Sequence, residues 1–341
     1  MTVRSKKTCG FNGCAEHAVA YSPHCWDHIQ DKDSYGSKFL EAAAGDKSLS
    51  GSNLKKVSLK NSIFEGVDLT GSDLSQADLS GSHFFDSKFK NATFIGTDMS
   101  GCDFTHCDLT GADLTKARLS GARLWNSDLS SANLSESDLS SGDLWNTRLF
   151  NTKLWHADLE GVKSLGRSNF SDGKGFRPAC RLDESGEISA EESYRQIKQS
   201  FMANGKYSDA SWASFKEKTM ERRMLWKKKD LNYLPSALMN VLCGYGEKPY
   251  RIIFSAFFCI LAFAFAYRSL GAIESIAYPG GGMRWLDYIY YSTITYTTVG
   301  YGDFIPKPYG LFRLLAACEA FLGVFLAGLF VFTLARKYSA R

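Results

Sequence analysis

The pattern of apolar and polar positions divides the chain into a long polar part and a shorter apolar part near the C-terminal end. Two apolar runs lie at 252–273 and 314–334; the first contains Arg268 and the second contains Glu319. A helix that crosses a bilayer needs about 20 predominantly apolar residues, and a long arginine side chain can extend its charge to the lipid–water interface. The runs therefore predict two membrane-spanning helices rather than buried helices of a soluble core.

An aromatic and apolar segment, Trp285 to Tyr296, lies between the two runs. Lysines and arginines precede the first run and follow the second, and this distribution of positive charge places both chain termini in the cytosol. Residues 274–310 then face outward, with 285–296 dipping back into the membrane. Non-helical backbone at that depth persists only where protein or a water-filled path surrounds it.

A third pattern fills residues 49–159. Every fifth residue from Leu49 to Leu159 is Leu, Phe or Met, and a mostly small residue such as Ala77 or Cys102 stands two positions before it. A period of five fits neither the 3.6 of a helix nor the 2 of a strand. It predicts a coil that turns a corner every five residues and stacks its apolar side chains inside.

Composition and charge narrow the classes of function. The 341 residues predict two or three domains. A net charge of +4 without a long basic block gives no reason to expect a nucleic-acid partner. The N-terminal residues MTVRSKKTCG contain no apolar core, so we expect no signal peptide, and we expect everything before Ile252 in the cytosol. A disulfide framework is not expected there.

The segment TTVGYGD, Thr297 to Asp303, lies between the re-entrant segment and the second run. A cation that crosses a membrane must exchange its hydration water for other oxygens at short range. Successive main-chain carbonyls can supply these oxygens when the backbone alternates its geometry, and Gly300 and Gly302 adopt positive φ at little cost. The segment is therefore a candidate cation-binding ribbon.

TTVGYGD resembles the selectivity filter of potassium channels, and residues 250–336 resemble the pore of two-span members of that family. The resemblance implies that main-chain oxygens bind dehydrated K⁺ and that the Thr298 hydroxyl closes the inner site. One chain supplies one filter strand, so the resemblance also implies a homotetramer in the lipid bilayer. The implied filter residues are Thr298, Val299, Gly300, Tyr301 and Gly302.

The same resemblance places Asp303 behind the outer mouth of the filter, where several family members bond it to a tryptophan. Here Tyr290 and Tyr291 offer hydroxyls instead. Some members also carry an acid behind the filter at the position of Ile294, so acid-dependent inactivation is less expected here. The re-entrant helix would aim the negative end of its dipole at the cavity and favour a cation.

The second apolar run leaves two questions open. Gly323 and Gly328 are candidates for a gating hinge, or for close helix packing by small residues. Glu319 is costly within a span and should face protein or water; it pairs behind the filter, tunes the cavity or holds structural hydrogen bonds. No helix carries arginine at every third position, so no voltage sensor is expected.

The period-five segment resembles the pentapeptide-repeat family, whose fold is a right-handed quadrilateral β-helix. Four repeats make one coil, and the coils stack about 4.8 Å apart. Cys102 and Cys107 are then small core residues rather than ligands. Lysines such as Lys88 and Lys90 interrupt the acidic residues, so mimicry of DNA is not expected. A rigid scaffold that assembles or spaces subunits is the better prediction.

The N-terminal stretch contains candidate metal ligands. Two ligand pairs separated by a short loop suit tetrahedral zinc, and the final C-x2-H resembles small zinc-binding knuckles. His17 and His24 are competing ligands. The site should be structural, because a module with so little core needs its metal to fold; it can also cap the β-helix. The predicted zinc ligands follow the pattern Cys9-x4-Cys14-x10-Cys25-x2-His28.

The expected fold is multi-domain: an all-α pore of two membrane-spanning helices and a re-entrant pore helix, fused to the β-helix and the zinc-binding module. The connector should hold a hairpin of two helices broken at Gly205, which resembles a tetratricopeptide-like hairpin, and an interfacial helix over 234–251. The expected segments are a zinc-binding knuckle at 1–40, the β-helix at 46–163, a loop at 164–189, the helical connector and interfacial helix at 190–250, and the pore domain at 251–341.

Together these patterns predict a potassium-selective channel in the cell membrane, with a cytosolic N-terminal domain that acts in assembly or gating. The alternative is a membrane-anchored interaction scaffold with little conduction. No base or nucleophile accompanies an open metal position, so enzymatic activity is not expected. The expected ions are permeant K⁺ and structural Zn²⁺. A cytosolic ligand or partner is expected without a chemical identity, and the gating stimulus is not predicted.

Overall fold

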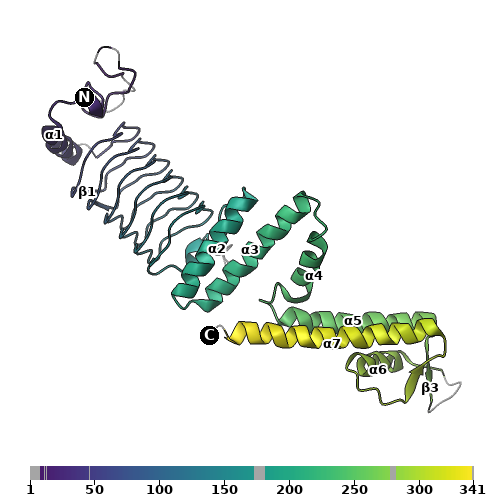
Figure 1. Cartoon of the computed structure of the whole chain (residues 1–341). Helices are drawn as coiled ribbons and strands as arrows, with labels where there is room; N and C mark the ends of the chain where they lie inside the picture. The colour runs from purple at the N-terminus through teal and green to yellow at the C-terminus, as the bar shows by residue number, and fades with distance from the viewer. Residues whose placement is uncertain are drawn as a thin grey trace. The chain divides into compact units, whose positions relative to one another are not determined.

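Residues 8–10, 12, 14–45, 47–172, 181–276 and 282–339 are described by the computed structural model. The chain divides into two compact units, Met1–Met224 and Leu225–Arg341. The first contains the stacked coils drawn in purple to blue in Figure 1, and the second contains four helices. Residues 173–180 of the expected loop and 277–281 of the expected outward segment lie outside the described residues.

The period-five segment forms stacked coils. Parallel backbone bridges join residues 20 positions apart, such as Asn53 with Asp73 and Asp113 with Asn133. The two short strands of this region, β1 (Ile63–Glu65) and β2 (His83–Phe85), pair in parallel with the same offset. One coil therefore takes up four pentapeptides, and this confirms the β-helix predicted from the period of five.

The apolar residue of each pentapeptide lies inside the coils. All of them from Leu49 to Leu159 are buried, and Phe64, Phe84 and Phe104 stack on one another with ring centroids 4.8 and 5.2 Å apart. Cys102 and Cys107 are buried beside them, and burial raises the pKa of both thiols to about 12. They are small core residues, as predicted, and they stay protonated near neutral pH.

The N-terminal segment covers the first coil. It contains a single 3-10 turn, η1 (Trp26–His28), and the helix α1 (Lys32–Gly45). Phe39 of α1 is buried and packs edge-on against Phe64 of the β-helix. The amide of Ala20 donates to the main-chain oxygen of Asn53 at 2.8 Å. These contacts cover the core and the main chain at the open end of the β-helix, as predicted for a cap.

The C-terminal end of the β-helix is covered by η2 (Arg167–Phe170), α2 (Glu187–Ala203) and α3 (Tyr207–Lys227). Phe170, Tyr194 and Phe201 are fully buried in the same hydrophobic core as the coils. The predicted hairpin of two helices is confirmed, and Gly205, with φ +68°, separates them. These helices complete the β-helix core, so the expected connector is divided between the two units.

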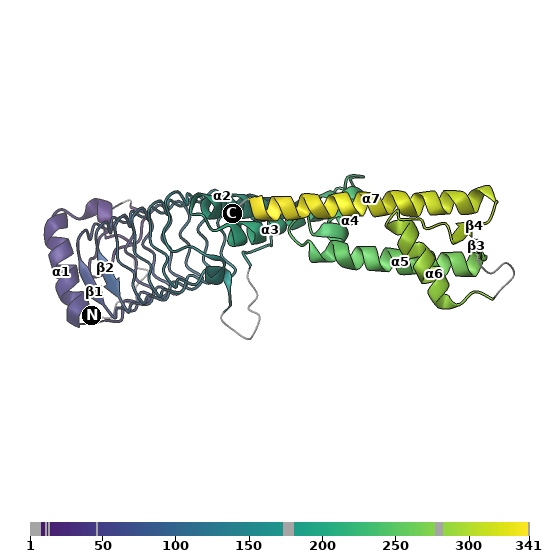
Figure 2. The same ribbon diagram turned by 90° about the horizontal axis from the view of Figure 1, so that it is seen from below.

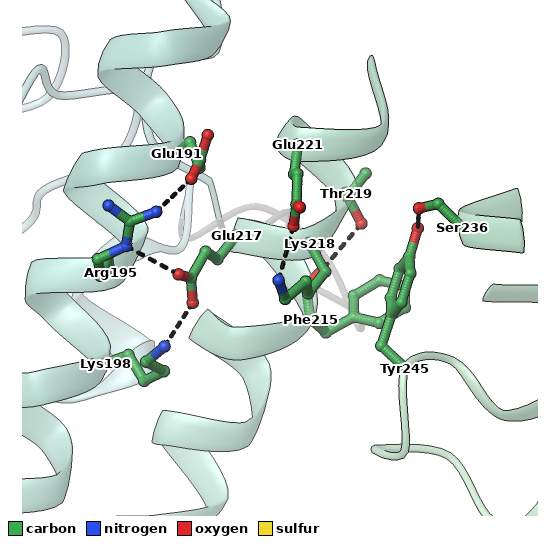
Figure 3. Close-up of polar contacts among 10 residues, drawn as sticks. All are labelled: Glu191, Arg195, Lys198, Phe215, Glu217, Lys218, Thr219, Glu221, Ser236 and Tyr245. Atoms are coloured by element: carbon green, nitrogen blue, oxygen red, sulfur yellow. Dashed lines mark hydrogen bonds and ion pairs between the residues drawn. The ribbon is translucent and has the colours of Figure 1, made fainter. Parts of the chain in front are cut away.

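A network of charged side chains joins α2 to α3. Glu217 is 6% exposed and accepts from Arg195 Nε at 3.0 Å and from Lys198 Nζ at 2.6 Å. Arg195 also pairs with Glu191 one turn earlier on α2 (Figure 3). A buried carboxylate needs such partners because an unpaired buried charge is strongly destabilising. The network therefore holds the hairpin in register.

The second unit is helical apart from one pair of short strands. Figures 1 and 2 show α5 and α7 side by side, with α6 and the antiparallel strands β3 and β4 at one end of them. Among the described residues, two helices are long and apolar enough to cross a membrane, Tyr250–Leu270 and Gly310–Ala335. The elements are α4 (Tyr233–Cys243), α5 (Tyr250–Leu270), β3 (Ile273–Ser275), α6 (Trp285–Tyr296), β4 (Phe304–Pro306) and α7 (Gly310–Ser339).

One predicted helix end was wrong. The first apolar run was expected to stay helical to Ile273, but α5 ends at Leu270 because Gly271 takes φ +55°. The stretch 234–251 was expected to hold a short interfacial helix and a turn with Gly and Pro before the first span, and α4 accordingly ends at Cys243, where Gly244 also takes φ +55°. A glycine in the left-handed region is a common helix C-terminus, because it closes the last turn without a Cβ clash.

Candidate functional site

The segment after α6 has an alternating backbone. Thr298, Gly300 and Gly302 have φ of +58°, +52° and +80°, whereas Val299 and Tyr301 between them lie outside the positive-φ region. In an ordinary extended chain successive carbonyls point in opposite directions. Alternation of the sign of φ turns successive carbonyls toward one side, which is the arrangement that a ring of carbonyl ligands needs. Positive φ at the non-glycine Thr298 was not predicted.

The main-chain oxygens of this segment are open acceptors. Within the described part of the chain, no donor reaches the main-chain oxygens of residues 298–302. The neighbouring amides are occupied: Val299 N and Gly300 N donate to the oxygen of Ile294 at 2.9 and 3.3 Å. The Thr298 hydroxyl donates to the Thr297 oxygen at 2.7 Å, which leaves its own lone pairs available. The ribbon therefore presents oxygens to something outside the chain.

Apolar side chains of the ribbon are also open in the single chain. Val299 is 52% and Tyr301 is 73% exposed. Exposed large apolar groups in an ordered segment indicate an interaction surface.

Asp303, at the end of the ribbon, is held by the chain. The Tyr290 hydroxyl lies near the Asp303 carboxylate, and the Asp303 main-chain oxygen accepts from Ile276 N at 3.0 Å. Tyr291 faces another way: it is buried and packs edge-on against Tyr267 at 5.0 Å. Of the two tyrosines expected to support Asp303, the structure brings Tyr290 to the carboxylate.

Glu319 of α7 links α7 to α5 and α6 through hydrogen bonds. It is fully buried; one carboxylate oxygen accepts from the Tyr267 hydroxyl of α5 at 2.7 Å, and the other accepts from the Ser292 hydroxyl of α6. The spanning carboxylate was recognisable in the sequence, but its partners were not, because they lie 52 and 27 residues away. The geometry matches the structural hydrogen-bonding role among the alternatives left open.

Replacement of Glu319 by leucine is expected to lower the free energy of unfolding in detergent by about 2–4 kcal/mol, because the buried Tyr267 hydroxyl loses its acceptor. Glu319→Gln keeps an acceptor oxygen and should cost less than half as much. Thermal midpoints from the fraction of protein that stays folded and monodisperse after heating measure this. Glu274→Leu, at an exposed carboxylate, is the control. Equal midpoints for Glu319→Leu and wild type would contradict the role.

The two glycines of α7 have different surroundings. A Cβ added at Gly323 would lie 1.9 Å from the main-chain oxygen of Tyr296, the last residue of α6. A Cβ at Gly328 would meet nothing within 4 Å. Gly323 therefore lets α7 approach the end of α6, and this is a packing role. Whether either glycine also acts as a hinge stays a prediction.

The predicted metal ligands come together in the first unit. The ligand atoms of Cys9, Cys14, Cys25 and His28 all lie within 4.8 Å of one another. Cys25 Sγ lies 3.1 Å from His28 Nδ1 and 3.7 Å from Cys14 Sγ. Three thiols and one imidazole at these separations fit a closed tetrahedral zinc site. The competing His17 and His24 are not members of this cluster.

Replacement of Cys25 by serine is expected to remove bound zinc, of which we expect about one ion per wild-type chain, and to lower the thermal midpoint of the first unit. Elemental analysis of the purified full-length protein measures the zinc content per chain. Cys102→Ser is a matched control, because Ser82 holds the corresponding position of the preceding coil and likewise donates to a main-chain oxygen there. Equal zinc contents in the two variants would contradict the assignment.

Comparisons with known families agree with this division. Residues 255–340 match the family described as "Ion channel", and residues 48–84, 87–126 and 127–163 match "Pentapeptide repeats" in eight copies. A search of curated proteins found no match.

Similar solved structures are pentapeptide-repeat proteins. Rfr23 from the cyanobacterium Cyanothece 51142 is 20% identical, with 37% of this chain and 93% of that chain covered and a TM-score of 0.28. A thylakoid-lumen protein from Arabidopsis thaliana is 23% identical, with 30% and 68% covered and a TM-score of 0.23. HetL from Nostoc sp. strain PCC 7120 is 29% identical, with 37% and 64% covered and a TM-score of 0.14.

The family matches and the two long apolar helices together indicate a membrane protein. Ion channels and pentapeptide-repeat proteins are not enzymes. The chain thus joins pentapeptide repeats in its N-terminal part to an ion channel domain at its C-terminal end.

Proposed function

We propose that four copies of this chain form a potassium-selective channel. The observation that carries the proposal is the alternating backbone at Thr298, Gly300 and Gly302, together with main-chain oxygens that no described donor occupies. In the proposed filter, the carbonyls of residues 298–302 and the Thr298 hydroxyl replace the hydration water of K⁺. Asp303, with the Tyr290 hydroxyl nearby, stabilises the ribbon from behind.

The tetramer is part of the same proposal. One ribbon presents its oxygens to one side, so a closed ring of ligands around an ion needs further ribbons. Four chains related by rotation about the pore axis supply that ring. The exposed Val299 and Tyr301 side chains would then be covered by the neighbouring chains.

Ion flux into proteoliposomes tests the proposed selectivity. Purified protein should admit K⁺ at least tenfold faster than Na⁺, and Ba²⁺ should block the flux. Equal rates for the two ions would refute the proposed filter. A tetramer that admits neither ion would favour the alternative, a membrane-anchored scaffold, so native mass spectrometry of the same preparation accompanies the measurement.

We propose that the N-terminal unit stays in the cytosol and stabilises or biases the channel. Both termini lie on the cytosolic side in this arrangement, as the flanking positive charges favour. The Cys9, Cys14, Cys25 and His28 cluster would hold structural zinc that secures the cap of the β-helix. A right-handed quadrilateral course of the coils is the proposed detail, and four pentapeptides per coil support it.

Deletion of residues 1–224 tests the role of this unit. The cut follows the boundary between the two compact units, whereas a cut at 162 would divide the core shared by the coils and α2. We expect the truncated channel to keep K⁺ selectivity but to lose tetramers at lower temperature, or to change its open probability in bilayers. Unchanged gating together with unchanged tetramer stability would contradict the proposed role of the N-terminal unit.

A further inference from the structure

One face of the β-helix carries large apolar side chains on its surface. Backbone hydrogen bonds join His106 N to the Trp125 oxygen at 2.9 Å and Asn126 N to the Trp145 oxygen at 3.0 Å. β1 and β2 place Glu65 beside Phe85 in the same way. We call the residues that this register stacks, coil upon coil, the aromatic column: Phe85, Thr105, Trp125 and Trp145.

The aromatic column is exposed. Phe85, Trp125 and Trp145 are 37%, 37% and 54% exposed, and Ile63, on the same face of the first coils, is 72% exposed. The large Phe150 and Trp155, which follow Trp145 on two other faces, contact Arg181 and Glu192 at the C-terminal end of the β-helix. Between Phe85 and Trp145 the matching positions on the other three faces are short or charged, apart from Ile95. Those positions are Lys90, Thr110 and Ser130, then Ile95, Thr115 and Ser135, then Ser100, Ser120 and Ser140.

The polar groups beside the column are mostly paired within the chain. Arg123 Nη1 lies 2.6 Å from Asp103 Oδ2, and the Arg123 guanidinium lies 4.8 Å above the Trp125 ring. Trp125 and Trp145 pack edge-to-face with centroids 6.1 Å apart. Trp and Arg side chains in packed arrangements dominate the binding energy of protein interfaces. The face is therefore built like the centre of a protein–protein contact.

We propose that the aromatic column contacts the same column of a second copy of this chain. The inference rests on the proposed tetramer. Four chains that share one pore hold their N-terminal units at a high effective concentration, and rotation about the pore axis puts the same residue of each copy at the same height. Like residues can then meet, Trp against Trp, across the axis or within pairs.

Charge on this face favours a protein partner over a lipid surface. Adsorption to anionic lipid relies on clusters of Lys and Arg. Here Arg123 is already neutralised by Asp103, and the next residue of that row is the acidic Asp143. A second copy brings no excess of either charge and offers an apolar surface of the same kind.

The experiment places one cysteine on each face of one coil in the full-length chain. The variants are Thr105→Cys, Thr110→Cys, Thr115→Cys and Ser120→Cys, all at the same position of their pentapeptides and all half-buried. Purified tetramers are treated with a short bismaleimide, and covalent dimers are measured on denaturing gels. Wild-type protein gives the background from native cysteines. Thr105→Cys should give at least about fivefold more dimer than the other three.

A second variant checks that the tryptophans cause the contact. Trp125→Thr with Trp145→Thr, in the Thr105→Cys background, should lower cross-linking about tenfold. The coils should still fold, because Thr105 already occupies the same column, and circular dichroism with unchanged K⁺ selectivity verifies this.

The outcomes separate the two proposals. Native tetramers whose Thr105→Cys variant cross-links no better than Thr110→Cys overturn the column contact and leave the channel proposal intact. Stronger cross-linking at another face also overturns it. A monomer in native mass spectrometry overturns both the tetramer and the column.

Discussion

Substitution of alanine for Gly300 abolishes K⁺ flux through the reconstituted protein, with an expected reduction of at least about 100-fold. Gly300 has φ +52°, and an L-residue pays about 1–2 kcal/mol to adopt the left-handed region. In the proposed tetramer this cost falls on four chains at once. The ribbon relieves it by rotating the peptide, which turns a carbonyl away from the ion.

Flux into proteoliposomes with K⁺ or Na⁺ measures this effect, and native mass spectrometry shows whether the variant still assembles. Gly310→Ala is the control, because Gly310 has no positive φ and a Cβ there would meet nothing within 4 Å. Wild-type K⁺ flux and selectivity in Gly300→Ala would show that the left-handed backbone at this residue has no part in conduction.

Substitution of alanine for Gly323 destabilises the pore unit by about 3 kcal/mol and reduces the yield of tetramer. The new Cβ would lie 1.9 Å from the Tyr296 oxygen, and a main-chain atom at a helix end cannot rotate aside as a side chain can. The two helices must separate, which displaces the ribbon that follows α6. Flux should therefore fall together with thermal stability.

Gly328→Ala is the matched control on the same helix, because its Cβ would meet no atom within 4 Å. Heating of detergent-solubilised protein followed by size-exclusion chromatography gives the midpoint of each variant. A Gly323→Ala protein as stable as Gly328→Ala contradicts the packing role. If its open probability changed without loss of stability, the hinge would be the better account.

Much of the architecture could be predicted because it follows from the spacing of apolar residues over short segments of the chain. The β-helix follows from the period of five, since each pentapeptide contributes one buried apolar side chain and one corner of the coil. The two spans follow from the length of their apolar runs. The cluster of candidate metal ligands was also predictable, because a short chain segment confines Cys9, Cys14, Cys25 and His28 to a small volume.

Other features depend on contacts between distant segments. The sequence shows that Glu319 places a costly carboxylate in a span. It does not show that Tyr267 and Ser292 are its partners, because these residues meet Glu319 only when α5, α6 and α7 pack together. Tyr290 and Tyr291 are neighbours in the chain, but they point to different partners because successive residues of a helix face different directions. The resemblance by itself offered both tyrosines equally.

By itself, then, the sequence determined the repeat, the spans and the glycines of the ribbon, because each depends on the chemistry of a few successive residues. Only the tertiary structure decided that α2 and α3 complete the β-helix core and that Gly323 touches the end of α6. Those outcomes depend on which distant surfaces meet, and the local sequence of each segment does not specify its partner.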